Sequence, residues 1–122
     1  MAIHSSTEIY GTVEDLQDFI GRAVINLRRD VKSAYAPALI YGAHGLGALI
    51  LRANKARDAG KVPIIDLLLE ELEVLQSMLR MLKKRGWLAY SAYEESVPLT
   101  VSISKQATSW KNHYLPESSP VA

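Results

Sequence analysis

The chain has 122 residues, of which 48% are hydrophobic and 22% are charged, and this size and composition predict one globular domain rather than a disordered protein. It contains no cysteine, which excludes disulfide bonds, thiolate metal sites and a cysteine nucleophile. Fourteen basic residues against thirteen acidic ones give a net charge of +1, which argues against a strongly cationic nucleic-acid binder but allows local basic patches.

The first amphipathic segment begins near Ser5, and the spacing of Ser5 and Glu8 is that of a capping box. Apolar residues then recur at alternating steps of three and four positions, which is the period of one helix face: Ile9, Val13, Leu16, Ile20, Ala23, Leu27 and Val31. Pro37 is expected to close this stretch and to occupy the first turn of the next helix.

The second expected helix runs from about Pro37 to Asp58, and Gly60 is expected to end it. It contains a dense glycine cluster at Gly42, Gly45 and Gly47. A phosphate-binding loop would need a preceding strand, and a P-loop would also need Gly-Lys-Ser/Thr, but neither is present. The cluster resembles the Gly-x-x-Gly loop of KH domains but lacks their basic residues and sheet. It therefore predicts close helix packing or a local helix irregularity.

The third expected helix starts after Pro63 and runs to about Arg85, where Gly86 should end it. Its apolar residues cover an arc wider than one bundle face: Ile64, Ile65, Leu67, Leu68, Leu69, Leu72, Leu75, Met78, Leu79 and Leu82. A helix that apolar is expected to be covered on two sides, which favours a homo-oligomer.

The fourth expected helix begins near Ser91, where Ser91 and Glu94 repeat the capping-box spacing. Pro98 lies about two turns in and predicts a kink or a delayed start. The apolar pattern continues through residues further along the chain: Val97, Val101, Ser104, Ala107 or Thr108, and Trp110.

Short connections between these helices favour antiparallel neighbours. We therefore expect an all-α fold without strands, an up-down-up-down four-helix bundle over residues 1–113, followed by a loose tail over residues 114–122. The N-terminal residues lack the basic patch and apolar run of a signal peptide, and no uncharged apolar segment approaches the ~20 residues that cross a bilayer. The expected location is cytoplasmic, without a membrane anchor.

The residues that could perform catalysis are sparse. His4, His44 and His113 are too scattered to predict a metal site, and no His-Glu-x-x-His spacing occurs. A HEPN-type ribonuclease resembles this architecture, but that family uses an Arg followed closely by a His, and neither His44 nor His113 has an Arg at such a distance. We therefore expect no catalytic residue, no metal and no cofactor.

The basic residues have two interpretations that the sequence leaves open. They can complement helix macrodipoles, worth up to ~1 kcal/mol per well-placed charge, or they can bind phosphates or an acidic partner. An up-down bundle would bring the late residues of helices one and three together at one end, here called the first pole: Arg28, Arg29, Lys32, Lys83, Lys84 and Arg85. The end of helix two, together with helix four, would form a second pole: Arg52, Lys55, Arg57, Lys105 and Lys111.

Several segments give the chain a resemblance to a known family. The most specific are residues 52–58 and 105–110, and residues 8–10, 29–32, 67–76 and 79–83 add to them. With these segments the chain resembles the accessory variability determinant proteins of diversity-generating retroelements. These belong with small four-helix-bundle proteins that include those encoded in intervening sequences of bacterial 23S ribosomal RNA.

The resemblance implies a non-enzymatic accessory protein that assembles as a homopentameric ring. It also implies binding to a reverse transcriptase and to template RNA or cDNA, in support of mutagenic reverse transcription. Two other hypotheses stand beside it: a structural homo-oligomer without a nucleic-acid role, and a small hydrolase or ribonuclease, which the missing Arg/His spacing disfavours. Salt-dependent binding to RNA would separate the nucleic-acid-binding accessory protein from the structural homo-oligomer.

Overall fold

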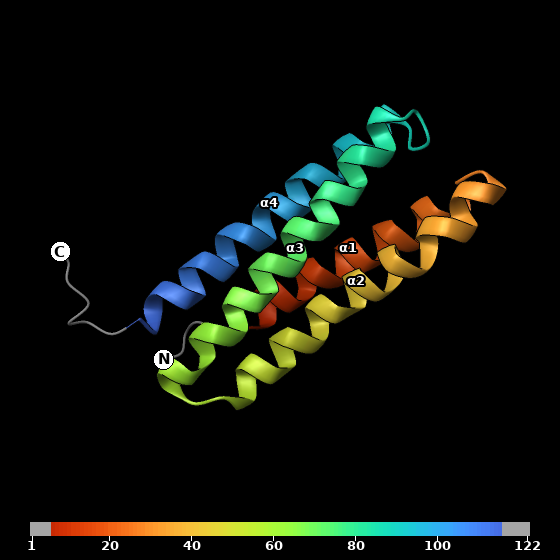
Figure 1. Cartoon of the computed structure of the whole chain (residues 1–122). Helices are drawn as coiled ribbons and strands as arrows, with labels where there is room; N and C mark the ends of the chain where they lie inside the picture. The colour runs from red at the N-terminus through yellow and green to blue at the C-terminus, as the bar shows by residue number, and fades with distance from the viewer. Residues whose placement is uncertain (1–5, 116–122) are drawn as a thin grey trace.

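The computed structural model describes residues 6–115, which form four α-helices and no strand. The helices are α1 (Thr7–Ile25), α2 (Arg29–Lys55), α3 (Lys61–Lys84) and α4 (Tyr90–His113), with a short 3-10 turn η1 (Asp58–Gly60) before α3. Consecutive helices run antiparallel, and α4 packs against both α3 and α1, which closes the bundle (Figure 1). The expected all-α, up-down-up-down four-helix bundle is therefore confirmed.

One apolar core runs along the bundle and receives side chains from all four helices. The period predicted for the first helix is correct, since Ile9, Val13, Leu16 and Ile20 are all buried. In α3, one row of leucines and one isoleucine point inward, and each such side chain contributes about 1.5–3 kcal/mol when fully buried. The inward row consists of Ile65, Leu68, Leu72, Leu75, Leu79 and Leu82.

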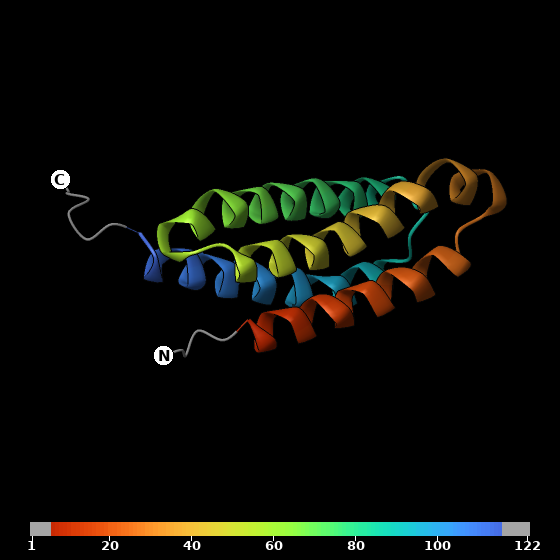
Figure 2. The same cartoon turned by 90° about the horizontal axis from the view of Figure 1, so that it is seen from below.

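The boundary between the first two helices differs from the prediction. The chain reverses after Ile25, and α2 already begins at Arg29 and continues through Pro37. Leu27 and Val31 are buried on either side of the reversal, so the apolar period passes through it without interruption and hides it in the sequence. Pro37 is exposed inside α2, where it removes one helical hydrogen bond and favours bending. Figure 2 shows the first turns of α2 bent away from the rest of the helix.

The predicted role of Gly60 is wrong, whereas that of Gly86 is confirmed. Gly60 is the N-cap residue of α3, and α2 ends earlier, at Lys55. The last turn of α2 is closed instead by the ammonium of Lys61, which donates to the carbonyl oxygens of Ala53 and Ala56 at 2.9 and 2.7 Å. A cation at this position satisfies carbonyl groups that lack helical partners.

Gly86 ends α3 in a Schellman motif. Its φ of 76° lies in the left-handed region, which glycine adopts without a Cβ clash. The amide of Gly86 donates to the carbonyl of Lys83, and the amide of Trp87 donates to that of Leu82, both at 2.9 Å. These two bonds are the pair that defines the motif, and they turn the chain toward α4.

The start and the inward face of α4 differ from the prediction. The helix begins at Tyr90, so Ser91 lies inside its first turn, and the N-cap residue is Ala89, which makes no side-chain capping bond. The predicted Ser5–Glu8 capping box involves a residue outside those described, and the structure starts α1 at Thr7. The helix α4 runs through Pro98 without a delayed start.

The core face of α4 also includes polar residues that the pattern did not select. Val97 and Val101 are exposed, while Ser96 and Thr100 are buried. The hydroxyl of Ser96 donates to the carbonyl of Tyr93 at 2.6 Å, and that of Thr100 donates to the carbonyl of Val97 at 3.2 Å. Because these bonds lie within the helix, the two small hydroxyl groups can be buried without a partner on another helix.

The glycine cluster of α2 includes one site of close helix packing. A Cβ on Gly47 would lie 3.1 Å from Nε2 of Gln17 and 3.6 Å from the ring of Tyr10, both on α1. Gly42 would meet Leu75 at an ordinary 3.5 Å, and Gly45 would meet nothing within 4 Å. In length and composition α2 would also suit a membrane-crossing helix, but in the structure it packs between α1 and α3, as core helices of bundles do.

We predict that Gly86→Ala destabilises the fold, because a Cβ in the left-handed region costs about 1–2 kcal/mol. The matched control is Gly21→Ala, inside α1, where the added Cβ meets nothing within 4 Å and alanine should stabilise by up to ~1 kcal/mol. Urea unfolding followed by circular dichroism measures both. Equal or greater stability of the Gly86→Ala variant would contradict the Schellman assignment.

Candidate nucleic-acid interface

Two chain reversals meet at one end of the bundle. The connection from α1 to α2 and the connection from α3 to α4 lie at the same end in both views (Figures 1 and 2). The rings of Tyr35 on α2 and Trp87 in the second connection have centroids 6.1 Å apart. This end gathers all six residues of the first pole.

The cations from the first reversal lie at a helix start, not at a helix end. Arg28 is the N-cap residue of α2, Arg29 is its first residue and Lys32 follows one turn on. A helix N-terminus has a partial positive charge, so basic residues there are disfavoured. The macrodipole interpretation therefore does not apply to these three residues. It does apply to Lys83 and Lys84, which lie in the last turn of α3.

Arg28 is neutralised by a neighbouring carboxylate. Its Nε and Nη2 donate to Oδ1 and Oδ2 of Asp30 at 2.9 and 2.8 Å, and Oδ1 also accepts the amide of Val31 at 2.9 Å. The hydrogen bond from Arg28 lowers the pKa of Asp30, and Asp30 in turn raises the pKa of Arg28. Asp30 also suits the N-terminus of α2, where a negative charge is favourable.

Aromatic rings lie between the basic side chains of the first pole. The ammonium of Lys83 lies 4.6 Å from the ring centroid of Tyr93 and 5.8 Å from that of Tyr90, and the guanidinium of Arg85 lies 5.4 Å from the ring of Trp87. Such cation–π contacts are worth about 0.5–1 kcal/mol each at exposed sites. The neighbouring carboxylate of Glu94 raises the pKa of Tyr90.

The sequence reasoning missed these rings as part of the site. A signal was present, because Trp87, Tyr90 and Tyr93 follow the basic run 83–85 at steps of three residues. Basic side chains interleaved with aromatic rings are typical of surfaces that bind single-stranded nucleic acid. Here Tyr90 is exposed, while Trp87 and Tyr93 are half-buried against the core. Within the described part of the chain, three first-pole cations have neither an ion pair nor a ring contact: Arg29, Lys32 and Lys84.

More of the basic residues in the second pole have an ion-pair partner or a favourable position at a helix end. Lys111 forms an ion pair with Asp66 at 3.0 Å. Arg52 and Lys55 lie in the last turn of α2, where the macrodipole favours cations. Arg57 follows in the connection, and Lys105 is exposed on α4 about two turns before its end. The structure thus places these residues toward one end, as expected. Three of them, Arg52, Lys55 and Lys111, are already stabilised there by a helix end or an ion pair.

The charges of the bundle are unequally divided between its two halves, when each helix is divided at its midpoint. The half with the first pole has eight basic residues: Arg22, Arg28, Arg29, Lys32, Arg80, Lys83, Lys84 and Arg85. It has five acidic ones: Asp18, Asp30, Glu73, Glu94 and Glu95. Among residues 6–115, the other half has six basic residues against seven acidic ones. The near-neutral total therefore conceals a positive first pole.

The first pole offers cations for phosphates and rings for bases. Among residues 6–115, no group of three or more His, Asp or Glu side chains is placed to hold a metal. His44 is exposed, His113 packs edge-on against the ring of Tyr114, and His4 lies outside the described residues.

No protein-family model, curated protein or solved structure matches the chain.

We predict that Arg28→Gln raises the pKa of Asp30 toward its ordinary value of about 3.9, since the main cause of its lowering is removed. A lowered pKa in the folded state means that the pair stabilises the fold above the ordinary pKa and loses this effect as the pH falls through the folded pKa. A carboxyl NMR titration measures the shift, with Arg22→Gln as the control because Arg22 pairs with Asp18 and Glu95 instead. An unchanged pKa in the Arg28→Gln variant would contradict the pairing.

Proposed function

We propose that this protein is a non-enzymatic accessory protein of a diversity-generating retroelement. It binds single-stranded template RNA or cDNA through the first pole, binds the reverse transcriptase and supports mutagenic reverse transcription. The single observation that carries the binding proposal is the positive first pole, with basic side chains interleaved with aromatic rings. The reverse transcriptase and the retroelement follow from the family resemblance of the sequence.

The first pole is favoured over the second because part of its charge opposes helix stability. Arg29 and Lys32 lie at the N-terminal end of α2, where a cation is disfavoured by up to ~1 kcal/mol. Phosphate groups placed there would neutralise these cations and release counterions. The second pole has Lys111 in an ion pair and Arg52 and Lys55 at a favourable helix end.

A structural homo-oligomer is the alternative, and a specific apolar surface favours self-association. Tyr41 is 78% exposed on α2 and Val74 is 55% exposed on α3. Together with Ala38 and Met78 they line a hollow of about 300 Å³ between the two helices, which also has one charged residue, Glu71, in its lining. We propose that a second copy of the chain covers this α2–α3 groove, in a homopentameric ring as the family resemblance implies. The two functions are compatible if the ring leaves the first pole open.

We predict that replacing Arg29, Lys32 and Lys84 together by Gln weakens binding to a single-stranded oligoribonucleotide. Each phosphate contact contributes about 0.7 to the slope of log affinity against log salt, so the slope should fall by up to about 2. The matched control replaces Arg52, Lys55 and Arg57 by Gln and should leave the slope nearly unchanged. Fluorescence anisotropy at several salt concentrations measures both.

The stability of the first variant should be equal to that of the wild type or somewhat higher, because Arg29 and Lys32 oppose the macrodipole of α2. The three side chains have no ion pair or ring contact within residues 6–115, and exposed charges contribute little to stability. Equal slopes of log affinity against log salt for the wild type and both variants would mean that the basic residues of both poles do not bind RNA. A loss confined to the control variant would assign binding to the second pole.

We predict that Tyr41→Glu combined with Val74→Glu dissociates the oligomer, because two carboxylates added beside Glu71 would put three like charges in the groove, which could not be buried against a second copy. Light scattering should report about five times the 13.5 kDa chain mass for the wild type and a single chain for the variant. The control is Ile25→Glu, an exposed position at the end of α1, outside the groove. A monomeric wild type at micromolar concentration would contradict the homo-oligomer.

A further inference from the structure

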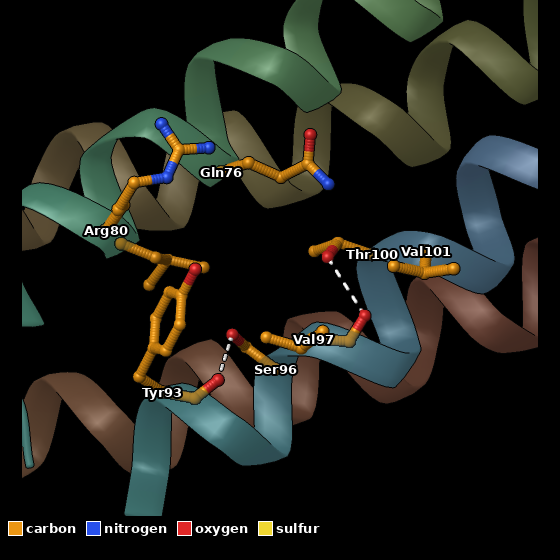
Figure 3. Close-up of a pocket in the computed structure, with 8 residues that line it drawn as sticks. Gln76, Arg80, Tyr93, Ser96, Val97, Thr100 and Val101 are labelled. Carbon is orange, nitrogen blue, oxygen red and sulfur yellow. Dashed lines mark hydrogen bonds between the residues drawn. The ribbon is translucent and has the colours of Figure 1, made fainter. Parts of the chain in front are cut away.

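A second hollow lies between α3 and α4, close to the first pole. It has a volume of about 210 Å³, and its lining includes Gln76 and Arg80 from α3 and Tyr93, Ser96, Thr100 and Val101 from α4. Figure 3 shows Gln76 across the hollow from Ser96 and Thr100, with Arg80 and the ring of Tyr93 at one end and the guanidinium of Arg80 pointing away from the two hydroxyl groups. Arg80 lies one turn before the basic run 83–85, so the hollow opens next to the phosphate-binding residues proposed above.

The floor of this pocket has two buried hydroxyl groups that are already hydrogen-bonded, and its rim has polar groups without partners. Ser96 and Thr100 are only 2% and 4% exposed, and both hydroxyl groups donate to carbonyls of their own helix. Within residues 6–115, the amide of Gln76 and the guanidinium of Arg80 have no hydrogen-bond partner. Arg80 is the one charged residue that lines the pocket. A polar ligand could therefore bind at the rim without displacing an existing interaction.

The size and the chemistry of the pocket restrict what can occupy it. A volume of about 210 Å³ equals roughly seven water molecules, which is more than a lone phosphate needs and far too little for a base pair. Leu79, Val97 and Val101 give it apolar walls. A side-chain amide both donates and accepts hydrogen bonds, as the edge of a base requires, and a guanidinium can stack on a planar ring or bind a phosphate. These features suit a planar ring with a polar edge.

We infer that the pocket between α3 and α4 accepts one unpaired base of a single-stranded RNA whose phosphates lie on the basic run 83–85. This inference deepens the proposed function and rests on it. The base lies against the apolar wall formed by Val97 and Val101, and the amide of Gln76 contacts its edge. Because a base inside a duplex cannot enter, the pocket gives the protein a preference for single strands over duplexes.

The test fills the pocket without changing a charge. Val101 lines the pocket and is partly exposed, so Val101→Trp places an indole there without removing a core side chain. Affinity for an oligouridylate should fall about tenfold, as expected when the binding surface for one base is lost. Affinity for an RNA duplex of the same length should stay unchanged. The control is Ser109→Trp, on an exposed position of α4 outside this pocket.

The possible outcomes separate the pocket from the proposed function. Loss of oligouridylate affinity in the variant with Gln at positions 29, 32 and 84, but not in Val101→Trp, would overturn the pocket and leave the proposed function intact. A wild type that binds neither RNA would overturn both. An equal loss for single strand and duplex in Val101→Trp would also overturn the pocket. If Val101→Trp failed to fold by circular dichroism, Gln76→Leu would test the same inference, since it removes the rim amide and should again affect the single strand alone.

Discussion

The reversal of the chain between Ile25 and Arg29 determines where the positive charge of this protein lies. If the first helix had continued to Pro37, residues 28, 29 and 32 would have followed its axis as internal or C-terminal cations. The early reversal places them at the start of α2 instead, beside the end of α3. Among residues 6–115, Arg28 is the one of these three cations that is compensated locally, by Asp30. The remaining cations at this helix start are at odds with the macrodipole, and an anionic partner would relieve that conflict.

The second reversal supplies the aromatic half of the same surface. The Schellman motif at Gly86 ends α3 directly after its basic run and turns Trp87 toward Tyr35. The helix α4 then starts with Tyr90 and Tyr93, whose rings lie near Lys83. The contact between Tyr35 and Trp87 joins the two reversals, and the turn at Gly86 places the aromatic rings next to the basic residues. Fold and candidate site are coupled here, because the turn that closes the bundle also forms the surface.

Much of the fold could be predicted from the sequence, because long segments with a helical apolar period and the glycine at position 86 are strong local signals. The first reversal could not, since Leu27 and Val31 continue the same period across it. The inward face of α4 was also hidden, because Ser96 and Thr100 satisfy their hydroxyl groups within the helix. The basic residues of the candidate site could be identified from the sequence. Their ion-pair and ring partners could not, because these depend on distances in the folded structure. The pairing of Lys111 with Asp66 joins residues far apart in the chain.

The central claim is that the first pole, and not the second, is the surface that meets nucleic acid. Its most direct test is an NMR titration of the isotope-labelled protein with a short single-stranded oligoribonucleotide, following every assigned backbone amide. The account predicts that the largest shifts come from the two reversals, around Arg29, Lys84 and Trp87, while the amides near Lys55 and Arg57 stay in place. Shifts centred on the end of α2, or no shifts at all at millimolar RNA, would contradict it.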